Sequence, residues 1–247
     1  PTTAFISTEM YQGILFMTLV PSTVQSSVAL TGIARGNVPG AVVAASMSSL
    51  SGVLLTPLLV MLLMGAGDGI QVDASVFGDI SLQLLLPFVL GQLAHNFVPK
   101  VREVAKSKAT KIVDRGSIWM VVYSAFSQGV VSGVWSNIAL WEIMFLAVFA
   151  VLLVVLMLWV TKVVPEKLGF PRPDVVAIQM CGTQKSLATG LPMASVIFGG
   201  ATLGVLIIPL MIYHLVQLIL CSAYVSRIAS EQSLSLIHIS EPTRRTP

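Results

Sequence analysis

Charge is what this sequence has least of. Of its 247 residues, 10% are charged and 55% are hydrophobic, whereas a soluble domain carries about 25% charged residues. This composition excludes an ordinary soluble enzyme and indicates an all-α polytopic membrane protein. The net charge of +3 does not point to a nucleic-acid partner, because the basic residues lie in loops, where they report membrane topology.

Cysteines and catalytic patterns are also scarce. Cys181 and Cys221 both stand in apolar context, so no disulfide framework is implied. The sequence has no P-loop, dinucleotide fingerprint, catalytic triad or zinc spacing. Cys181 with Lys185 is the only pair that offers a nucleophile and a base at membrane depth. We therefore expect neither an enzyme nor a resident cofactor.

Both ends of the sequence are unusual. It opens at Pro1, between spans and with no signal peptide, so we interpret it as a fragment. The stretch from Leu234 to Arg244 reads as the translation of a transposase-type sequencing adaptor, and the alternative is a natural disordered tail. We exclude residues 233–247 from the fold as a non-native tail.

Seven apolar segments are long enough to cross about 30 Å of hydrocarbon. When they are alternated across the membrane, the basic loops around 100–111 and 162–172 fall on one side with Arg35 and Arg227. The positive-inside rule places that side, and the C-terminus, in the cytoplasm. We expect the inner membrane of a bacterium. The segments are 12–34, 41–64, 77–97, 112–131, 138–164, 175–198 and 201–228.

Two of these segments are interrupted by polar residues. The first is broken at Pro21–Ser27, and the second at Met180–Pro192. Proline removes a backbone donor, and neighbouring Ser, Thr and Gln side chains can satisfy the freed groups. Paired interruptions are typical of a binding site at the middle of the bilayer; the alternative is two ordinary proline kinks. The residues expected to break the helices are Pro21, Gly182 and Pro192.

Lys185 is the most telling residue of the second interruption. It lies about 16 Å from the cytoplasmic entrance of its span, near the midplane. One interpretation is a snorkelling lysine, although its side chain cannot reach the interface from that depth. The other is a lysine in a polar cavity. The acids of the chain lie in loops or near span ends, so Lys185 must face carbonyls of an unwound helix, hydroxyls, an acid outside this sequence or an anionic substrate.

These motifs carry a family resemblance. The stretches 21–27, 34–37, 84–88 and 181–194 resemble the bile acid:sodium symporter family, in its SBF-like bacterial branch related to the seventh member of solute carrier family 10. The resemblance implies ten spans in two inverted five-span repeats, with two broken helices that cross. This sequence would then hold spans 4–5 at 1–64 and spans 6–7, the panel helices, at 77–131. Spans 8–10, part of the core, would lie at 138–230.

The sequence departs from the family at the second motif. Sodium-coupled members carry an acid before the glycine and an asparagine after the glutamine, where this chain has Met180 and Lys185. We hypothesise that the Lys185 ammonium replaces one bound sodium ion. Sodium or a proton remains a candidate coupling ion, and the metal content is unknown. The candidate residues for binding substrate or ion are Ser22, Thr23, Gln25, Ser26, Ser27, Cys181, Thr183, Gln184, Lys185 and Ser186.

Four further residues are secondary candidates: Ser46, Ser49, His214 and Gln217. His214 and Gln217 share one helix face, and interhelical hydrogen bonding is the favoured role for them over substrate contact. We predict a secondary active transporter of a small organic anion in the lipid bilayer, of unknown oligomeric state. The alternative is a membrane regulator of ion or calcium homeostasis that does not transport.

Overall fold

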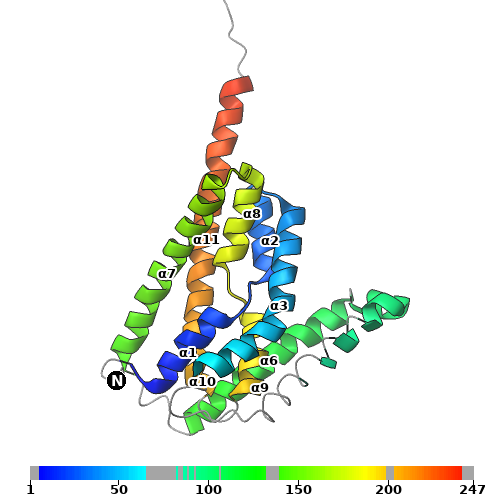
Figure 1. Ribbon diagram of the computed structural model, residues 1–247, viewed down its shortest axis with the longest axis vertical. Coiled ribbons are helices and arrows are strands. Elements are labelled where there is room, and N and C mark those ends of the chain that lie inside the picture. Colours follow the sequence, from blue (N-terminus) through cyan, green and yellow to red (C-terminus); the bar gives the residue numbers. More distant parts are fainter. Residues whose placement is uncertain are drawn as a thin grey trace, which may run out of the picture.

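The computed structural model describes residues 6–64, 82, 86–87, 89–91, 93–105, 107–131, 139–198 and 203–240. Every regular element in these residues is a helix, as the composition predicts (Figure 1). The expected loop at 65–76, the turns at 132–137 and 199–200, and the beginning of the 77–97 segment lie outside the described residues.

The helices follow the apolar segments of the sequence. Their bounds are α1 Thr8–Leu19, α2 Val24–Ile33, α3 Val38–Met64, α5 Pro99–Ala105, α6 Lys108–Val131, α7 Leu140–Lys167, α8 Arg172–Thr183, α9 Leu187–Ile197, α10 Leu203–Leu206 and α11 Ile208–Ser240. The two basic loops expected around 100–111 and 162–172 are largely helical. Helix α5 and the first turn of α6 cover most of the first loop, and α7 continues through Pro165 to Lys167 into the second. Helix α11 runs on into the tail that we set aside, as far as Ser240.

The first interruption is real but shorter than predicted. Helices α1 and α2 meet at a bend of 58°, and only residues 20–23 are non-helical. Thr23 takes the extended conformation of an N-cap residue, so the helix restarts at Val24. Val24 to Ser27, which we expected in the break, form the first turn of α2.

The second interruption is also real, and it spans only Gln184 to Ser186. Two of the predicted breakers are wrong. Gly182 lies inside α8, and Pro192 lies inside α9. A proline within a membrane helix removes one hydrogen bond, and the remaining backbone bonds keep the helix continuous.

Three described helices are long and apolar enough to cross a membrane: α3, α7 and the segment 203–230. The bent pair α1 and α2 brings the total to four. The sequence predicts seven spans, so these assignments are supported where these helices lie. For the remaining segments they stay predictions, and so do the division into panel and core and the ten-span repeat.

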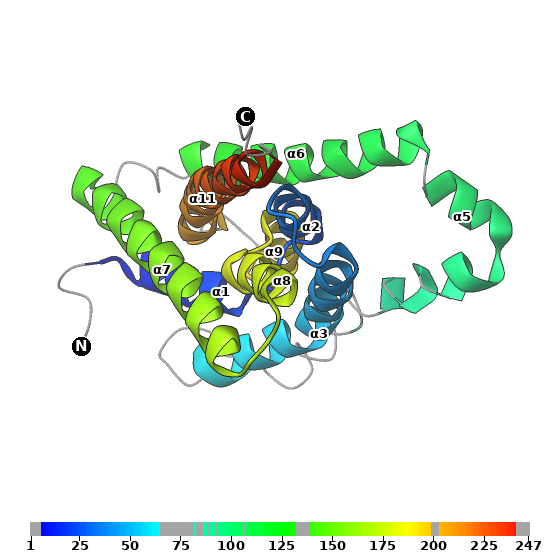
Figure 2. The same ribbon diagram turned by 90° about the horizontal axis from the view of Figure 1, so that it is seen from above.

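The helices pack around the two interruptions. Helix α8 contacts α2, α3 and α7, while α11 contacts α1, α2, α7 and α9. Seen from above, α1, α2, α3, α7, α8, α9 and α11 gather together (Figure 2). Helix α6 contacts α9 and α10 and runs along one side of this cluster toward α5, which lies away from it. The largest apolar cluster includes Phe16, Met180, Leu191 and Leu210, so four of these helices share one core.

Two glycines allow close packing at the interruptions. A Cβ on Gly52 of α3 would lie 2.6 Å from Cβ of Pro21. A Cβ on Gly182 would lie 2.7 Å from Cγ2 of Thr161 on α7. Both distances are far below van der Waals contact. The first break therefore rests directly on α3, and the end of α8 rests directly on α7.

Candidate functional site at the meeting of two broken helices

The two interruptions touch each other through their backbones. The Ser186 N–H donates to the Pro21 carbonyl over 2.9 Å, although the two residues are far apart in the sequence. At this point α1 and α8 end, and α2 and α9 begin. Two helix C-termini and two helix N-termini therefore meet in one small volume. The carbonyl ends favour cations, and the amide ends favour anions.

Lys185 closes the carbonyl end of α1. Its Nζ donates to the Thr18 carbonyl over 2.7 Å and to the Val20 carbonyl over 3.0 Å. These are among the last carbonyls of the helix, which have no partner within it. Of the partners that we considered for the lysine, the structure thus shows the carbonyls of an unwound helix end.

The backbone of Lys185 is held by the side chains of α11. Its N–H donates to Gln217 Oε1 over 2.7 Å, and its carbonyl accepts from Gln217 Nε2 over 2.8 Å. His214 Nδ1 lies 3.2 Å from the same carbonyl. Gln217 is fully buried. One glutamine therefore satisfies both polar groups of an unwound peptide, and both secondary candidates on α11 act as interhelical hydrogen-bonding groups.

Ser22 closes the carbonyl end of α8. Its hydroxyl donates to the Cys181 carbonyl over 2.6 Å. Two further hydroxyls serve the same helix end: Tyr213 donates to the Thr183 carbonyl over 2.8 Å, and Ser27 to the Met180 carbonyl over 3.4 Å. The end of α8 is thus satisfied by neutral groups, in contrast to the end of α1.

Ser22 and Lys185 occupy corresponding places in the two breaks. Each is the residue just before an N-cap, Thr23 for α2 and Ser186 for α9. Each reaches across to the C-terminal carbonyls of the other broken helix. The site is therefore reciprocal in geometry, but one arm carries a hydroxyl and the other a positive charge.

Most of the other candidate residues lie in the same cluster. Ser26 donates to Gln184 Oε1, and Ser49 donates to the Ser22 carbonyl over 3.4 Å. Ser186 caps α9 by accepting from the Thr189 N–H. Within the described part of the chain, Gln184 Nε2 is the buried side-chain atom left without a hydrogen-bond partner.

Other candidates face away from this cluster. The Thr183 hydroxyl lies 3.4 Å from that of Thr161 on α7. The Cys181 thiol donates to the Ala41 carbonyl over 3.5 Å, so it does not address Lys185. Gln25 is exposed on α2. Ser46 lines a groove of about 600 Å³ with Val24 and residues of α3.

Sequence reasoning missed three hydroxyl groups that contribute to the site. The Tyr213 hydroxyl satisfies α8, Thr56 donates to the Leu19 carbonyl over 2.8 Å, and Ser48 accepts from the Ser22 N–H over 3.0 Å. Tyr213 stands next to His214 in the apolar first half of α11, and this grouping was the available signal. Ser48 belongs to the serine cluster of Ser46 and Ser49, for which packing is the favoured role from sequence. Thr56 carries no comparable signal, because lone hydroxyls are common in membrane helices.

A small cavity adjoins the ammonium group. It has a volume of about 210 Å³ and is lined by Lys185 and Thr18 with Met17, Leu153, Met157 and Tyr213. An ammonium has three N–H donors, and the two carbonyls of α1 take two of them. Lys185 therefore combines a fixed positive charge with a mostly apolar neighbouring space.

Two interrupted helices that meet in this way define a membrane protein with the broken-helix site found in secondary transporters. Residues 2–230 match the model of the SBF-like CPA transporter family. The chain belongs to that family, as the motifs at the two breaks indicate.

Similar proteins from other organisms agree with this assignment. The chain is 42% identical to uncharacterized protein PA2026 of Pseudomonas aeruginosa, over 97% of this chain and 72% of that protein. It is 40% identical to the putative symporter YfeH of Escherichia coli, over 88% of this chain and 65% of that protein. It is 28% identical to sodium/bile acid cotransporter 7 of Mus musculus, over 90% of this chain and 65% of that protein. The chain thus spans about two thirds of these relatives.

Proposed function

We propose that this protein is a secondary active transporter of a small organic anion in a bacterial inner membrane, with its C-terminus in the cytoplasm. The observation that carries the proposal is the placement of Lys185 Nζ on the carbonyls of Thr18 and Val20, where two broken helices meet. The named relatives, a putative symporter and a sodium/bile acid cotransporter, support the transporter class.

In this proposal the ammonium of Lys185 takes the place of one coupling cation. Helix C-terminal carbonyls are the groups that bind sodium in broken-helix transporters, and here a tethered positive charge already occupies those of α1. Uptake then does not require sodium at this position. The chain has Met180, buried in the apolar core, at the place of the family's acid. The loss of that negative charge and the gain of the Lys185 ammonium both make the site more positive than in sodium-coupled members.

The substrate side of the proposal rests on the remaining donors. Lys185 borders the 210 Å³ cavity, where its third N–H can meet an oxyanion and the apolar walls can hold a short carbon chain. Gln184 Nε2 is a further buried donor without a hydrogen-bond partner in the described residues, although Gln184 does not line this cavity. A charged donor beside an apolar space suits a carboxylate better than a neutral sugar or a cation.

Uptake into proteoliposomes tests the proposal directly. The full-length protein is reconstituted and given a panel of radiolabelled organic anions, with and without a sodium gradient. We expect accumulation of at least one anion, and we expect that removing sodium does not abolish it. If uptake proceeds while Lys185→Asn leaves both its rate and its ion dependence unchanged, the role of the lysine is wrong.

The second candidate function is a membrane regulator of ion or calcium homeostasis that does not itself transport. Its support is the similarity to the cotransporter 7 group of vertebrates, on which our sequence-based alternative rests. The same proteoliposomes separate the two functions. Absence of flux for every anion under every gradient, from protein that is folded by size-exclusion chromatography, favours the regulator.

A further inference from the structure

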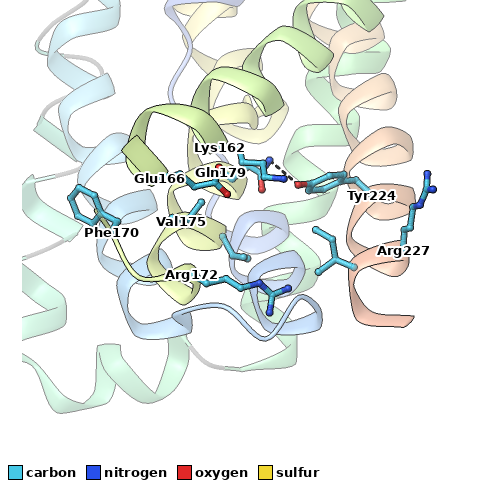
Figure 3. Close-up of a pocket in the computed structure, with 10 residues that line it drawn as sticks. Lys162, Glu166, Phe170, Arg172, Val175, Gln179, Tyr224 and Arg227 are labelled. Atoms are coloured by element: carbon cyan, nitrogen blue, oxygen red, sulfur yellow. Dashed lines mark hydrogen bonds between the residues drawn. The ribbon is translucent and has the colours of Figure 1, made fainter. Parts of the chain in front are cut away.

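A second pocket lies at the far end of α8 from the broken-helix site. It has a volume of about 560 Å³ and is formed by the end of α7, the beginning of α8 and the middle of α11. Figure 3 shows its lining. Four charged side chains line this pocket, whereas Lys185 is the one charged residue that lines the cavity beside the second break. The pocket's charged residues are Lys162, Glu166, Arg172 and Arg227.

The balance of charge in this pocket favours an anion. Three side chains carry a positive charge and one a negative charge, so its net charge is +2. The cations come from three different helices: Lys162 from α7, Arg172 from the first residue of α8, and Arg227 from α11. Arg172 also places the pocket beside the amino-terminal end of α8, which favours negative charge.

The floor of the pocket offers a neutral donor. Gln179 is buried, and its Nε2 donates to the Leu158 carbonyl over 2.8 Å and to the Tyr224 hydroxyl over 3.2 Å. The bond from Gln179 to Tyr224, drawn as a dashed line in Figure 3, joins α8 to α11. Because the Tyr224 oxygen accepts from Gln179, its own proton is directed elsewhere and can be donated to a ligand. A phosphate oxygen suits such a group together with arginines.

The outer surface of α7 continues from the pocket as an apolar face. Trp159, one helical turn before Lys162, is 61% exposed, and Leu156 and Leu152 beyond it are 51% and 64% exposed. Phe170, which follows the end of α7, also lines the pocket and is 45% exposed. Exposed aromatics beside basic residues are typical of the membrane–water interface. An acyl chain could therefore lie along α7 while its headgroup stays in the pocket.

We propose that this pocket binds the phosphate headgroup of an anionic phospholipid of the cytoplasmic leaflet. Lys162, Arg172 and Arg227 hold the phosphate, Tyr224 donates a hydrogen bond, and the exposed face of α7 receives the acyl chains. Basic pockets between membrane helices on the cytoplasmic side are suited to such lipids. The occupied pocket ties α7, α8 and α11 together, and α8 leads directly to the second break.

Native mass spectrometry of the full-length protein in detergent tests this site. The protein is titrated with phosphatidylglycerol and, separately, with phosphatidylcholine of the same chains. We expect tighter binding of phosphatidylglycerol, which weakens by about fivefold for each pocket cation replaced by glutamine. The variant is Lys162→Gln/Arg172→Gln/Arg227→Gln. The matched control, Lys100→Gln/Lys108→Gln/Lys167→Gln, removes the same charge from exposed positions outside the pocket.

Four outcomes are distinguishable. Selective loss in the pocket variant supports the site, while equal loss in the control shows diffuse attraction and overturns it. Equal binding of the two lipids also overturns it. Binding of glycerol 3-phosphate in the absence of any binding of phosphatidylglycerol assigns the pocket to a soluble phosphate and overturns the lipid. If the triple variant does not fold, Lys162→Gln and Arg227→Gln are measured singly, and unchanged affinity in both rejects the proposal.

Discussion

The two breaks have the same geometry but differ in the charge of the groups that donate to the helix C-termini. In each, the residue before an N-cap reaches across to the last carbonyls of the other helix. At the end of α8 the reaching groups are hydroxyls of Ser22, Ser27 and Tyr213. At the end of α1 the ammonium of Lys185 acts together with the hydroxyl of Thr56. A helix C-terminus bears partial negative charge, so α1 is neutralised from within the chain and α8 is not.

This difference suggests where a mobile ion could still act. The carbonyls of α1 hold a positive charge that cannot leave, because it is part of the polypeptide. Among the described residues the carbonyls at the end of α8 are served by hydroxyl groups, which bring no charge of their own. If a coupling ion is used at all, we expect it at the end of α8 rather than at the end of α1.

The largest effect is expected from Lys185→Met. Methionine keeps an unbranched apolar side chain but leaves the Thr18 and Val20 carbonyls without their donor. Val20 is buried, and a buried polar group without a partner costs about 1–3 kcal/mol, whereas Thr18 is exposed and its carbonyl loses less. The melting temperature in detergent should therefore fall, and the loss of the positive charge should abolish uptake. Lys185→Arg is the control that keeps the charge. Equal stability of the Met variant and the native protein would contradict the assigned contacts.

The second largest loss of stability is expected from Gln217→Leu. It removes both hydrogen bonds to the Lys185 peptide and keeps the volume of the side chain nearly unchanged. The free energy of unfolding should fall by about 1–3 kcal/mol for each group left unsatisfied. The fall is smaller if His214 still forms a hydrogen bond with the Lys185 carbonyl. Thermal unfolding in detergent measures it, with Gln25→Leu as the matched substitution on the exposed face of α2. A change no larger than that of the control would remove Gln217 from the site.

Gly52→Ala should destabilise by steric means. The added methyl would lie 2.6 Å from Pro21, so α3 must move away from the first break. Overpacking of this kind costs about 1–3 kcal/mol. Gly91→Ala, where the new methyl meets no atom within 4 Å, is the control for the same change. Unfolding curves that coincide for the two variants would show that the first break does not depend on close packing.

Ser22→Ala should have the smallest effect. It removes the hydroxyl that serves the Cys181 carbonyl, at a cost of about 1 kcal/mol, while Tyr213 and Ser27 still serve the same helix end. Uptake should persist at a reduced rate. The comparison with Lys185→Met is the informative one: similar losses in both would mean that charge gives α1 nothing beyond an ordinary hydrogen bond.

Much of the fold could be predicted from the sequence, because apolar runs and their polar interruptions are local signals. Val38–Met64 and Leu140–Lys167 follow from hydropathy alone. The exact length of each break did not follow. Thr23 allows α2 to restart early, and Pro192 sits within an intact helix, because the competing hydrogen bonds decide these points.

The site was predictable in its residues but not in its contacts. Lys185 stands out in the sequence because an ammonium at membrane depth is costly. Its partners are main-chain carbonyls, one of them 165 residues away. Because every residue has a main-chain carbonyl, the sequence does not show which of them will accept the hydrogen bond. Tyr213 and Thr56 were missed for the same reason, since their acceptors are also main-chain atoms of distant segments.

The central claim is that the ammonium of Lys185 stands in for a bound cation. The most direct test is a titration of the melting temperature with sodium chloride against potassium chloride at equal ionic strength, for the native protein and for Met180→Glu/Lys185→Asn. We predict no sodium-specific shift in the native protein and a saturable, sodium-specific increase in the double variant. A sodium-specific increase in the native protein that the double variant lacks would contradict the claim.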